Sequence, residues 1–414
     1  MKKRSDNPFP MAALDLSGFI KKAWTEGWLD EYSNSHFLIR AIENKVDDIE
    51  WKSQLLNNNT TSIYSPISQD GKIDFNKFSL NFVVNLSSLL LTMSMTFGEK
   101  NIKRFIEYQL SAGKRKYDRD KFFQALSEIE ILSFYCRRCK WNNAIYEPPI
   151  GINGSNPEAK FVLSLPNICC LDQIEIEVNI EVKTPKFPVI NEARTRTAIP
   201  TSLLSDTGRA EIQALCRANN TNCIFPRATK LVQFINSATN KFKKPKENEF
   251  NLLYINWSYS DFPSNSFLEA WSLLTNEVNG ILTHPEVGIK LPFDEPICRE
   301  AYERITAVIV YTSSLEQLMF SDFHYVWKTS EKVGPHFRMF VLNKELREKE
   351  LTNKSDILFK ITGMNPDTPK SGEWRVLLDH NWTEQTSLEN KAMDCKFGVD
   401  VLDVVNRNPW RLKE

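Results

Sequence analysis

The segment from 174 to 184 alternates apolar and polar side chains without interruption, and this pattern constrains the fold more than any other feature. The apolar positions are Ile174, Ile176, Val178, Ile180 and Val182, and the intervening ones are Glu175, Glu177, Asn179, Glu181 and Lys183. Successive side chains of a β-strand point to opposite faces of the sheet, so this segment is predicted to be a strand. One face belongs in a core, and the simplest expectation for the other face is that it lies in water.

Neighbouring segments predict an α/β fold around that strand. The segment 305–311, Ile-Thr-Ala-Val-Ile-Val-Tyr, is a nearly unbroken apolar run, which is typical of a strand covered on both faces. Further strands are expected at 144–146, 160–165 and 250–257, and helices at 120–137, 228–243 and 267–274. We expect the segments 250–257 and 305–311 to share one mixed sheet with 174–184, and Ile180 and Val182 to be buried against a flanking helix.

The chain divides into three parts by pattern. Residues 1–115 carry apolar residues at helical spacing over 14–32, 35–49 and 78–112, with a loop at 57–71, so we expect an all-helical N-terminal domain. The α/β core is expected to span 116–345, and the polar segment 346–414 is expected to be a C-terminal appendage. A chain of 414 residues fits such a division, because single cores seldom grow beyond about 250–300 residues.

Neither a membrane span nor an export signal is predicted. The most apolar stretch, 82–95, is interrupted by Asn, Ser and Thr residues and is expected to be a buried helix. No apolar run of signal-peptide length follows the basic start Met1-Lys-Lys-Arg. The eight cysteines are therefore expected to be reduced thiols of a cytoplasmic protein, with Cys136 and Cys139 neighbours on a helix face rather than zinc ligands.

The charge balance excludes one class of nucleic-acid-binding protein. Lys and Arg number 52, and Asp and Glu also number 52. This balance argues against binding through bulk positive charge, as in histone-like proteins, but it does not exclude a local basic groove. Lys186 and the basic run 241–246 can line such a groove, although a solvated loop and a helix end explain them equally well.

A Glu-x-Lys motif ends the alternating strand. The spacing alone carries little information, because the chain has five such motifs, at 43–45, 50–52, 158–160, 181–183 and 389–391. The motif at Glu181 and Lys183 stands out by context, because an expected helix with two glutamates and then a Pro157-Glu158 pair precede it. This order of elements, a helix, a Pro-acid pair, a strand and then Glu-x-Lys on a second strand, resembles the PD-(D/E)XK superfamily of restriction-endonuclease-like nucleases. The resemblance covers 117–184 by motif and extends to 311 by element order.

The resemblance implies a restriction-endonuclease-like mixed central sheet and metal-dependent hydrolysis of phosphodiester bonds. That reaction needs a nucleophilic water, charge relief on the non-bridging oxygens and help for the leaving oxygen. Glu158 and Glu181 are the expected ligands of Mg²⁺, for which Mn²⁺ can substitute, with the carbonyl of Val182 as a third ligand. Lys183 is expected to orient the attacking water or to offset negative charge.

The helix before the sheet is expected to supply one more acid, and two glutamates compete for this role. The apolar face of that helix is formed by Phe122, Ala125, Ile129, Leu132 and Cys136. Glu128 lies about 80° from the centre of this face, and Glu130 about 120° away on the other side. A residue that reaches the sheet edge should lie on the flank, neither buried nor fully in water. Glu128 is therefore predicted to point its carboxylate toward Glu158 and Glu181, with Glu130 as the alternative.

The expected function is that of a Mg²⁺-dependent endonuclease acting on nucleic acid, DNA rather than RNA. Family association links such enzymes to antiviral defence or restriction. The N-terminal helical domain is expected to serve recognition or assembly into a homo-oligomer. The alternative is a non-catalytic nucleic-acid-binding or scaffold protein that retains a degenerate nuclease fold. Glu158 in place of the usual Asp, together with the neutral total charge, favours that alternative.

Overall fold

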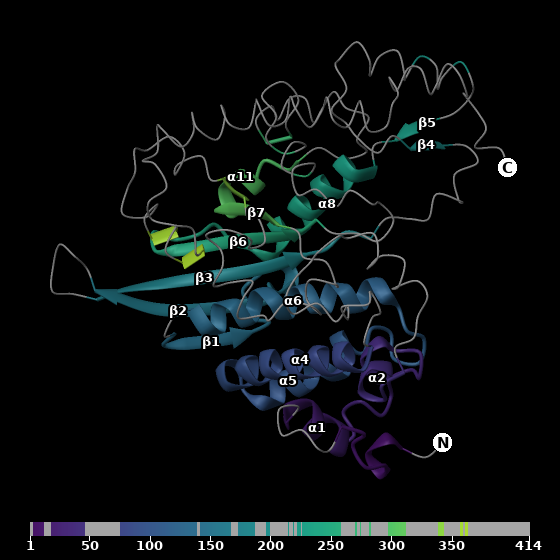
Figure 1. Ribbon diagram of the computed structural model, residues 1–414. Helices are drawn as coiled ribbons and strands as arrows, with labels where there is room; N and C mark the ends of the chain where they lie inside the picture. The colour runs from purple at the N-terminus through teal and green to yellow at the C-terminus, as the bar shows by residue number, and fades with distance from the viewer. Residues whose placement is uncertain are drawn as a thin grey trace, which may run out of the picture.

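A six-stranded mixed sheet lies at the centre of the protein (Figure 1). The structure is a computed structural model, and it describes residues 3–11, 18–45, 75–138, 141–166, 173–186, 196–198, 214, 218, 222–224, 226–257, 270, 274, 281–282, 297–311, 338–342, 357–358 and 361–362. The sheet contains, in spatial order, β1 (Asn143–Tyr146), β2 (Ala159–Pro166), β3 (Gln173–Lys183), β6 (Glu249–Asn256), β7 (Ala307–Tyr311) and β8 (Arg338–Val341).

The sheet combines antiparallel and parallel pairs. Strands β1, β2 and β3 run antiparallel, β3, β6 and β7 run parallel, and β8 returns antiparallel to β7. Helix α8 (Pro226–Lys241) lies between β3 and β6 in the chain, because parallel neighbours need a crossover connection. A separate two-stranded parallel sheet pairs β4 (Arg196–Ala198) with β5 (Asn222–Ile224). The expectation that 250–257 and 305–311 share a mixed sheet with 174–184 is confirmed.

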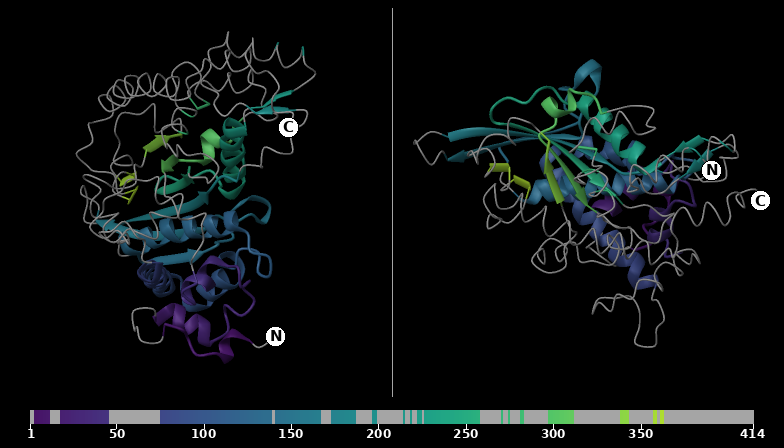
Figure 2. Two further views of the ribbon diagram at one scale, coloured as in Figure 1. Left: turned by 45° about the vertical axis from the view of Figure 1, so that its right-hand side comes forward. Right: turned by 90° about the horizontal axis from the view of Figure 1, so that it is seen from above.

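Helices cover both faces of the central sheet, as Figures 1 and 2 show. Helix α6 (Arg119–Arg138) packs against β3 on one face, and α8 packs against it on the other. Below α6 lie α4 (Phe75–Phe97) and α5 (Glu99–Phe105). Other helices among the described residues are η1 (Arg4–Asp6), α1 (Gly18–Thr25), α2 (Phe37–Ile42), the π-helix η3 (Ile106–Leu110), η4 (Ile152–Gly154) and α11 (Ala301–Arg304).

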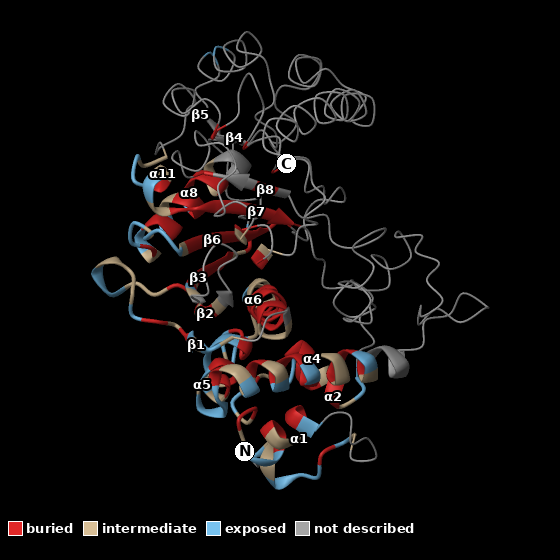
Figure 3. Ribbon diagram, turned by 90° about the vertical axis from the view of Figure 1, so that its left-hand side faces the viewer, coloured by how far each residue is buried: buried red, intermediate tan, exposed pale blue. Residues whose placement is uncertain are grey.

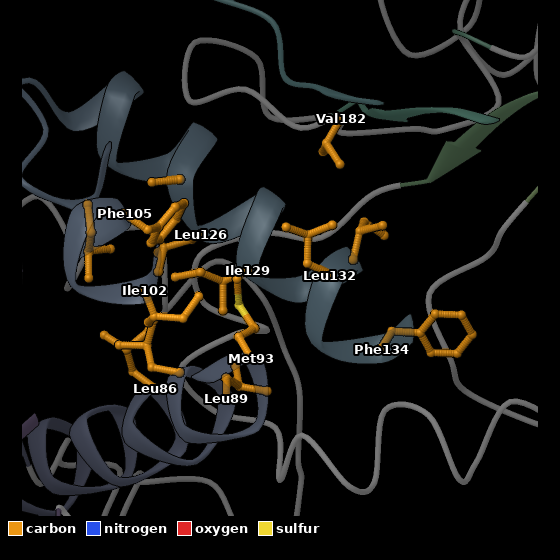
Figure 4. Packing of buried hydrophobic residues seen from close by; sticks show 14 of the residues in the cluster. Leu86, Leu89, Met93, Ile102, Phe105, Leu126, Ile129, Leu132, Phe134 and Val182 are labelled. Atoms are coloured by element: carbon orange, nitrogen blue, oxygen red, sulfur yellow. The ribbon is translucent and has the colours of Figure 1, made fainter. Parts of the chain in front are cut away.

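The side chains of β3 alternate between the two faces. Ile180 and Val182 lie in the core that the sheet shares with α6, as expected, and Figure 4 shows Val182 above that helix. The opposite face is only partly in water, so the simplest expectation for it holds for Glu175, which is exposed, and is wrong farther along the strand. Asn179 and Glu181 are buried there because α8 packs over this part of β3, and Figure 3 colours the neighbouring strands β6 and β7 as buried. The side-chain NH2 of Asn179 donates to Oε1 of Glu249 and to Oδ1 of Asn251, each at 2.8 Å.

The N-terminal helices belong to the same hydrophobic core as α6. Buried residues of α1, α2, α4 and α5 form one continuous cluster with those of α6 and of the adjoining sheet face. The segment expected to be helical at 78–112 is helical as far as Leu110, with a break at Gly98, whose φ of 86° favours glycine. A separate domain ending at 115 stays a prediction. The loop 57–71 lies outside the described residues, as do most of the helix 267–274 and of the segment 346–414.

Helix α4 is long and apolar enough, over Ser79–Phe97, to cross a membrane by length and composition alone. The expectation of a buried helix holds for one side, where Phe82, Leu86 and Leu90 pack into the core against α6. On its other side Leu91 and Met95 are exposed. The helix is therefore a core element of this fold with one apolar strip at the surface.

A buried histidine joins two of the N-terminal helices. His36 is the N-cap of α2, and its Nδ1 accepts a hydrogen bond from the backbone N–H of Leu38. Its Nε2 lies 2.9 Å from the carbonyl of Leu110, so Nε2 carries the proton and donates. Burial lowers the pKa of His36 to about 3, although the Leu110 carbonyl opposes this effect. The ring is therefore neutral at physiological pH, and a proton on Nδ1 would break the cap.

We expect the stability conferred by His36 to be lost as the pH falls. The pKa in the unfolded chain is about 6.5 and the folded value is about 3, so the contribution is complete above pH 6.5 and declines toward pH 3. The variant His36→Asn keeps a capping oxygen but does not titrate. The difference in unfolding free energy between wild type and variant should shrink by about 2 kcal/mol between pH 7 and pH 5. Urea unfolding at both pH values measures it, and a constant difference would contradict a neutral His36.

Candidate active site

Glu158 and Glu181 are neighbours across two paired strands. Ala159 of β2 pairs with Ile180 of β3, so the next position along each strand brings Glu158 beside Glu181. The backbone N–H of Glu158 donates to the carbonyl of Ile180 at 2.9 Å and extends this pairing. Pro157 precedes the pair, and its fixed backbone suits the residue that enters a strand. The two carboxylates that the sequence predicted to converge therefore lie at one end of the β2–β3 ladder.

Glu181 is a carboxylate buried with two ammonium groups. Its side chain has no exposed surface, and its Oε1 lies 2.6 Å from Nζ of Lys183 and 3.8 Å from Nζ of Lys241. Lys241, at the end of α8, also donates to the carbonyl of Asn156 at 2.5 Å. The second oxygen of Glu181, Oε2, has no hydrogen-bond partner among the described residues. A buried carboxylate oxygen without a partner is costly, and it is the kind of atom that a cation or a water would satisfy.

Lys183 stays charged despite its burial. Burial alone would lower the pKa of this ammonium, but the adjacent Glu181 carboxylate, followed by Glu158 and Glu128, raises the pKa above its ordinary value. The Lys183 side chain is largely buried and lies on the same sheet face as Glu181, because the two residues are separated by one position on β3. The site therefore places a fixed positive charge beside its carboxylates.

Glu128 reaches the same cluster from α6. Its Oε1 accepts a hydrogen bond from the hydroxyl of Tyr146 at 3.0 Å, and its carboxyl group is also hydrogen-bonded to Glu158. Burial raises the pKa of Glu128 to about 8, and the charges of Glu181 and Glu147 act in the same direction. Burial, followed by the charges of Glu128 and Glu181, likewise raises the pKa of Glu158 well above its usual range. Glu128 and Glu158 thus share a proton in the absence of a cation.

Of the two helix glutamates, Glu128 lies in the cluster, as predicted, but its side chain is more buried than predicted. Glu128 contacts Glu158, whereas Glu130 lies where its charge acts on Tyr311 of β7. The helical-wheel argument assumed that the site residue is partly exposed, and this was wrong. Glu128 is 8% exposed and Glu130 is 1% exposed, because α6 is enclosed between the sheet and α4.

A cavity of about 700 Å³ opens onto Glu128 and Glu158, and Glu181 is buried behind its lining. Glu128, Glu158, Val182 and Lys183 are part of its lining. Four more lysines line it, and they come from the segment before α6, from α6 itself, from the end of β3 and from α8: Lys114, Lys121, Lys186 and Lys230. Although the whole chain is neutral, this cavity combines lysines with buried carboxyl groups, and two of the lysines also pair with acids, Lys114 with Glu31 at 2.8 Å and Lys186 with Asp118 at 3.0 Å. Such an arrangement suits a ligand that carries phosphate groups next to a cation-binding cluster.

The donor set was tested for a divalent cation. In the part of the chain that the structure describes, no three His, Cys, Asp or Glu side chains stand ready-made as a metal site. Mg²⁺ in proteins is commonly held by one or two carboxylates together with waters and substrate phosphates. Glu158 and Glu181 supply two carboxylates from adjacent positions of the β2–β3 pairing, and Oε2 of Glu181 has no hydrogen-bond partner among the described residues. The residues therefore fit a Mg²⁺ or Mn²⁺ ion in donor chemistry, while the Val182 carbonyl as third ligand stays a prediction.

Several contributors to the site were missed by sequence reasoning. Tyr146, Lys114, Lys121 and Lys230 were not singled out, because a lone Tyr or Lys in β1, a turn or a helix carries no local signal. Lys241 was noted within a basic run but had an adequate explanation as a helix-end cation. Lys186 does line the cavity, and its ammonium also pairs with Asp118 at 3.0 Å and Asp120 at 3.2 Å.

Comparison with known proteins adds no further assignment. A scan against protein-family models gives no match, and neither a search of curated proteins nor a search of solved structures gives one.

Proposed function

We propose that this protein is a metal-dependent nuclease with a restriction-endonuclease-like fold of the PD-(D/E)XK type, which hydrolyses phosphodiester bonds of DNA. One observation carries the proposal: Glu128 of α6, Glu158 just before β2 and Glu181 of β3 meet beside Lys183, next to a cavity lined with lysines. Three successive parts of the chain supply these groups. Clustered buried carboxylates are costly unless they share protons or a cation, so they are retained where they serve a site.

The side chains have separate tasks in the proposed reaction. Glu158 and Glu181 hold the cation, and Glu128 with its Tyr146 hydrogen bond supports Glu158 or a water between them. A bound Mg²⁺ supplies charge relief on the phosphate oxygens and a more acidic water. Lys183 places a fixed positive charge beside the reacting phosphate and orients the attacking water. The lysines of the cavity wall bind the flanking phosphates of the nucleic acid.

A non-catalytic protein that retained the fold is the second candidate. Its support is that the cluster is partly self-compensated without a cation: Glu128 shares a proton with Glu158, and two lysines approach Glu181. The same lysine-lined cavity would then bind nucleic acid without cutting it. The two candidates differ in one observable: with Mg²⁺ present, the nuclease cleaves the bound nucleic acid, whereas the non-catalytic protein leaves it intact.

Cleavage assays with two matched glutamate variants test the proposal. We expect the wild type to cut plasmid or single-stranded DNA in Mg²⁺ or Mn²⁺ and to be inactive in chelator. Glu128→Gln should lower the rate by about 10- to 100-fold, because it removes a carboxylate that supports the metal ligands. Glu130→Gln changes a neighbouring buried glutamate outside the cluster and should keep most of the activity. Equal loss in both variants, or an active Glu128→Gln with an inactive Glu130→Gln, would contradict the assignment of α6.

A further inference from the structure

Tyr108 is an exposed aromatic side chain on the wall of the candidate active site. The large hydrophobic residues exposed in the described ranges are Leu91, Met95, Tyr108 and Ile145, and of these Tyr108 alone lines the cavity. It is 61% exposed and comes from η3, whereas the carboxylates come from α6 and the sheet. The cavity therefore has an open aromatic ring on one wall and the proposed reacting groups at its base.

Two side-chain hydrogen bonds anchor the backbone of the segment that carries Tyr108. The hydroxyl of Tyr32 donates to the carbonyl of Ile106 at 2.5 Å, and Nε2 of His36 donates to the carbonyl of Leu110 at 2.9 Å. These bonds hold the first and last residues of the π-helix η3, and π-turns occur frequently at functional sites. The exposed ring thus projects from a fixed backbone rather than from a chain end.

The turn after η3 brings a cation to the same ring. Ala112, Gly113 and Lys114 have φ angles of 48°, 92° and 57°, a strained run of the kind that surrounding structure must enforce. The Lys114 carbonyl is fixed by the backbone N–H of Ser33 at 3.0 Å. Nζ of Lys114 lies 4.8 Å from the centroid of the Tyr108 ring, so the ring and the ammonium form one unit on the cavity wall.

An exposed ring among lysines has a specific use in nucleic-acid binding. Proteins that bind single strands combine a positive groove for the phosphates with aromatic rings on which bases stack. In a duplex both faces of each base are covered by neighbouring bases, so a ring can stack only on a base that is unpaired and unstacked. A cavity of about 700 Å³ is also of the size that holds one small ligand, which fits a nucleotide rather than a duplex.

We propose that Tyr108 is a base-stacking residue and that the substrate enters the active site as single-stranded DNA. The proposal rests on the proposed nuclease function for the identity of the ligand. On this account the lysines of the wall track the phosphates, Tyr108 stacks on a base, and the next phosphodiester bond is directed toward Glu158 and Lys183.

Fluorescence anisotropy in chelator tests this without any cleavage step. The probes are an oligothymidine, an abasic oligonucleotide of the same length, and a duplex of that length. Stacking adds about 1–3 kcal/mol per base, so the wild type should bind the oligothymidine about tenfold tighter than the abasic strand. Tyr108→Ala should remove that ratio, and Tyr108→Phe should keep it because the ring remains. Lys121→Met, which removes one cavity lysine, should weaken binding of both single strands by the same factor.

Three results would overturn the proposal: an unchanged ratio in Tyr108→Ala, a wild type that binds the abasic strand as tightly as the oligothymidine, or a duplex bound as tightly as the single strand. The outcome is separate from that of the nuclease proposal. A Tyr108-dependent ratio in a protein that never cuts would leave stacking intact and reject catalysis. Cleavage by a protein that binds the oligothymidine and the abasic strand equally well would reject stacking and leave catalysis intact.

Discussion

Cleavage of DNA in Mg²⁺ is expected to fall by about 100- to 1,000-fold when Lys183 is replaced by Met, because the change removes the fixed charge beside the reacting phosphate. Met keeps most of the apolar stem and loses the ammonium. The matched control is Lys160→Met, which removes a lysine on the same sheet face that pairs with Glu177 at 2.7 Å and does not line the cavity. Initial rates on a labelled single strand measure both variants, and the control should stay within a few-fold of the wild type.

The same substitution should also reduce stability, and a second variant separates the two effects. Lys183 is 2.6 Å from a fully buried Glu181, and removing one partner of a buried ion pair costs about 3–5 kcal/mol. Lys241 at 3.8 Å offsets part of this cost. The double variant Glu181→Gln with Lys183→Met removes both charges and should recover stability without recovering cleavage. A folded Lys183→Met protein that cuts at the wild-type rate would contradict the role of Lys183.

Replacing Glu158 by Gln is expected to preserve stability in chelator while abolishing stabilisation by metal. Burial and the neighbouring charges of Glu128 and Glu181 raise the pKa of Glu158, so the metal-free fold holds this group protonated, and Gln resembles the protonated acid in shape. The wild type therefore loses stability as the pH rises from the ordinary carboxyl pKa through the raised value, and the variant loses less, because Glu128 still titrates but position 158 does not.

Urea unfolding with and without Mg²⁺ at pH 8 measures this contrast. A metal present at 100 times its dissociation constant should stabilise the wild type by about 2.7 kcal/mol and should leave Glu158→Gln unchanged. Glu177→Gln is the control. Glu177 lies on the same face of β3 as Glu181, but its carboxylate pairs with Lys160 and does not line the cavity. Equal stabilisation of Glu158→Gln and the wild type by Mg²⁺ would show that Glu158 holds no metal.

Local sequence patterns predicted the strands and helices well, because each pattern depends only on residues that are consecutive in the chain. The alternation over 174–184 gave β3 within one residue, and helical spacing over 120–137 gave α6 within one residue at each end. What covers each face is not a local property. The sequence of β3 alone predicts that its polar face is solvated. In the structure α8, which begins more than forty residues later, covers part of that face.

The candidate site was predictable only in part for the same reason. Glu158, Glu181 and Lys183 could be selected because a proline and a strand context surround them. Their partners come from positions without local signals: Tyr146 in an edge strand, Lys241 at a helix end and Tyr108 in a π-turn. The complete burial of residues 125–135 of α6 could not be predicted from a helical wheel either, because it depends on α4 packing against the helix.

Manganese binding and DNA cleavage, measured on the same preparations of wild type and Glu158→Gln, test the central claim most directly. The account predicts that the folded wild type binds Mn²⁺ and cuts DNA only when the metal is present, and that the equally folded Glu158→Gln variant does neither. A wild type that cuts in chelator, one that binds Mn²⁺ without cutting, or a Glu158→Gln variant that cuts at the wild-type rate would contradict it.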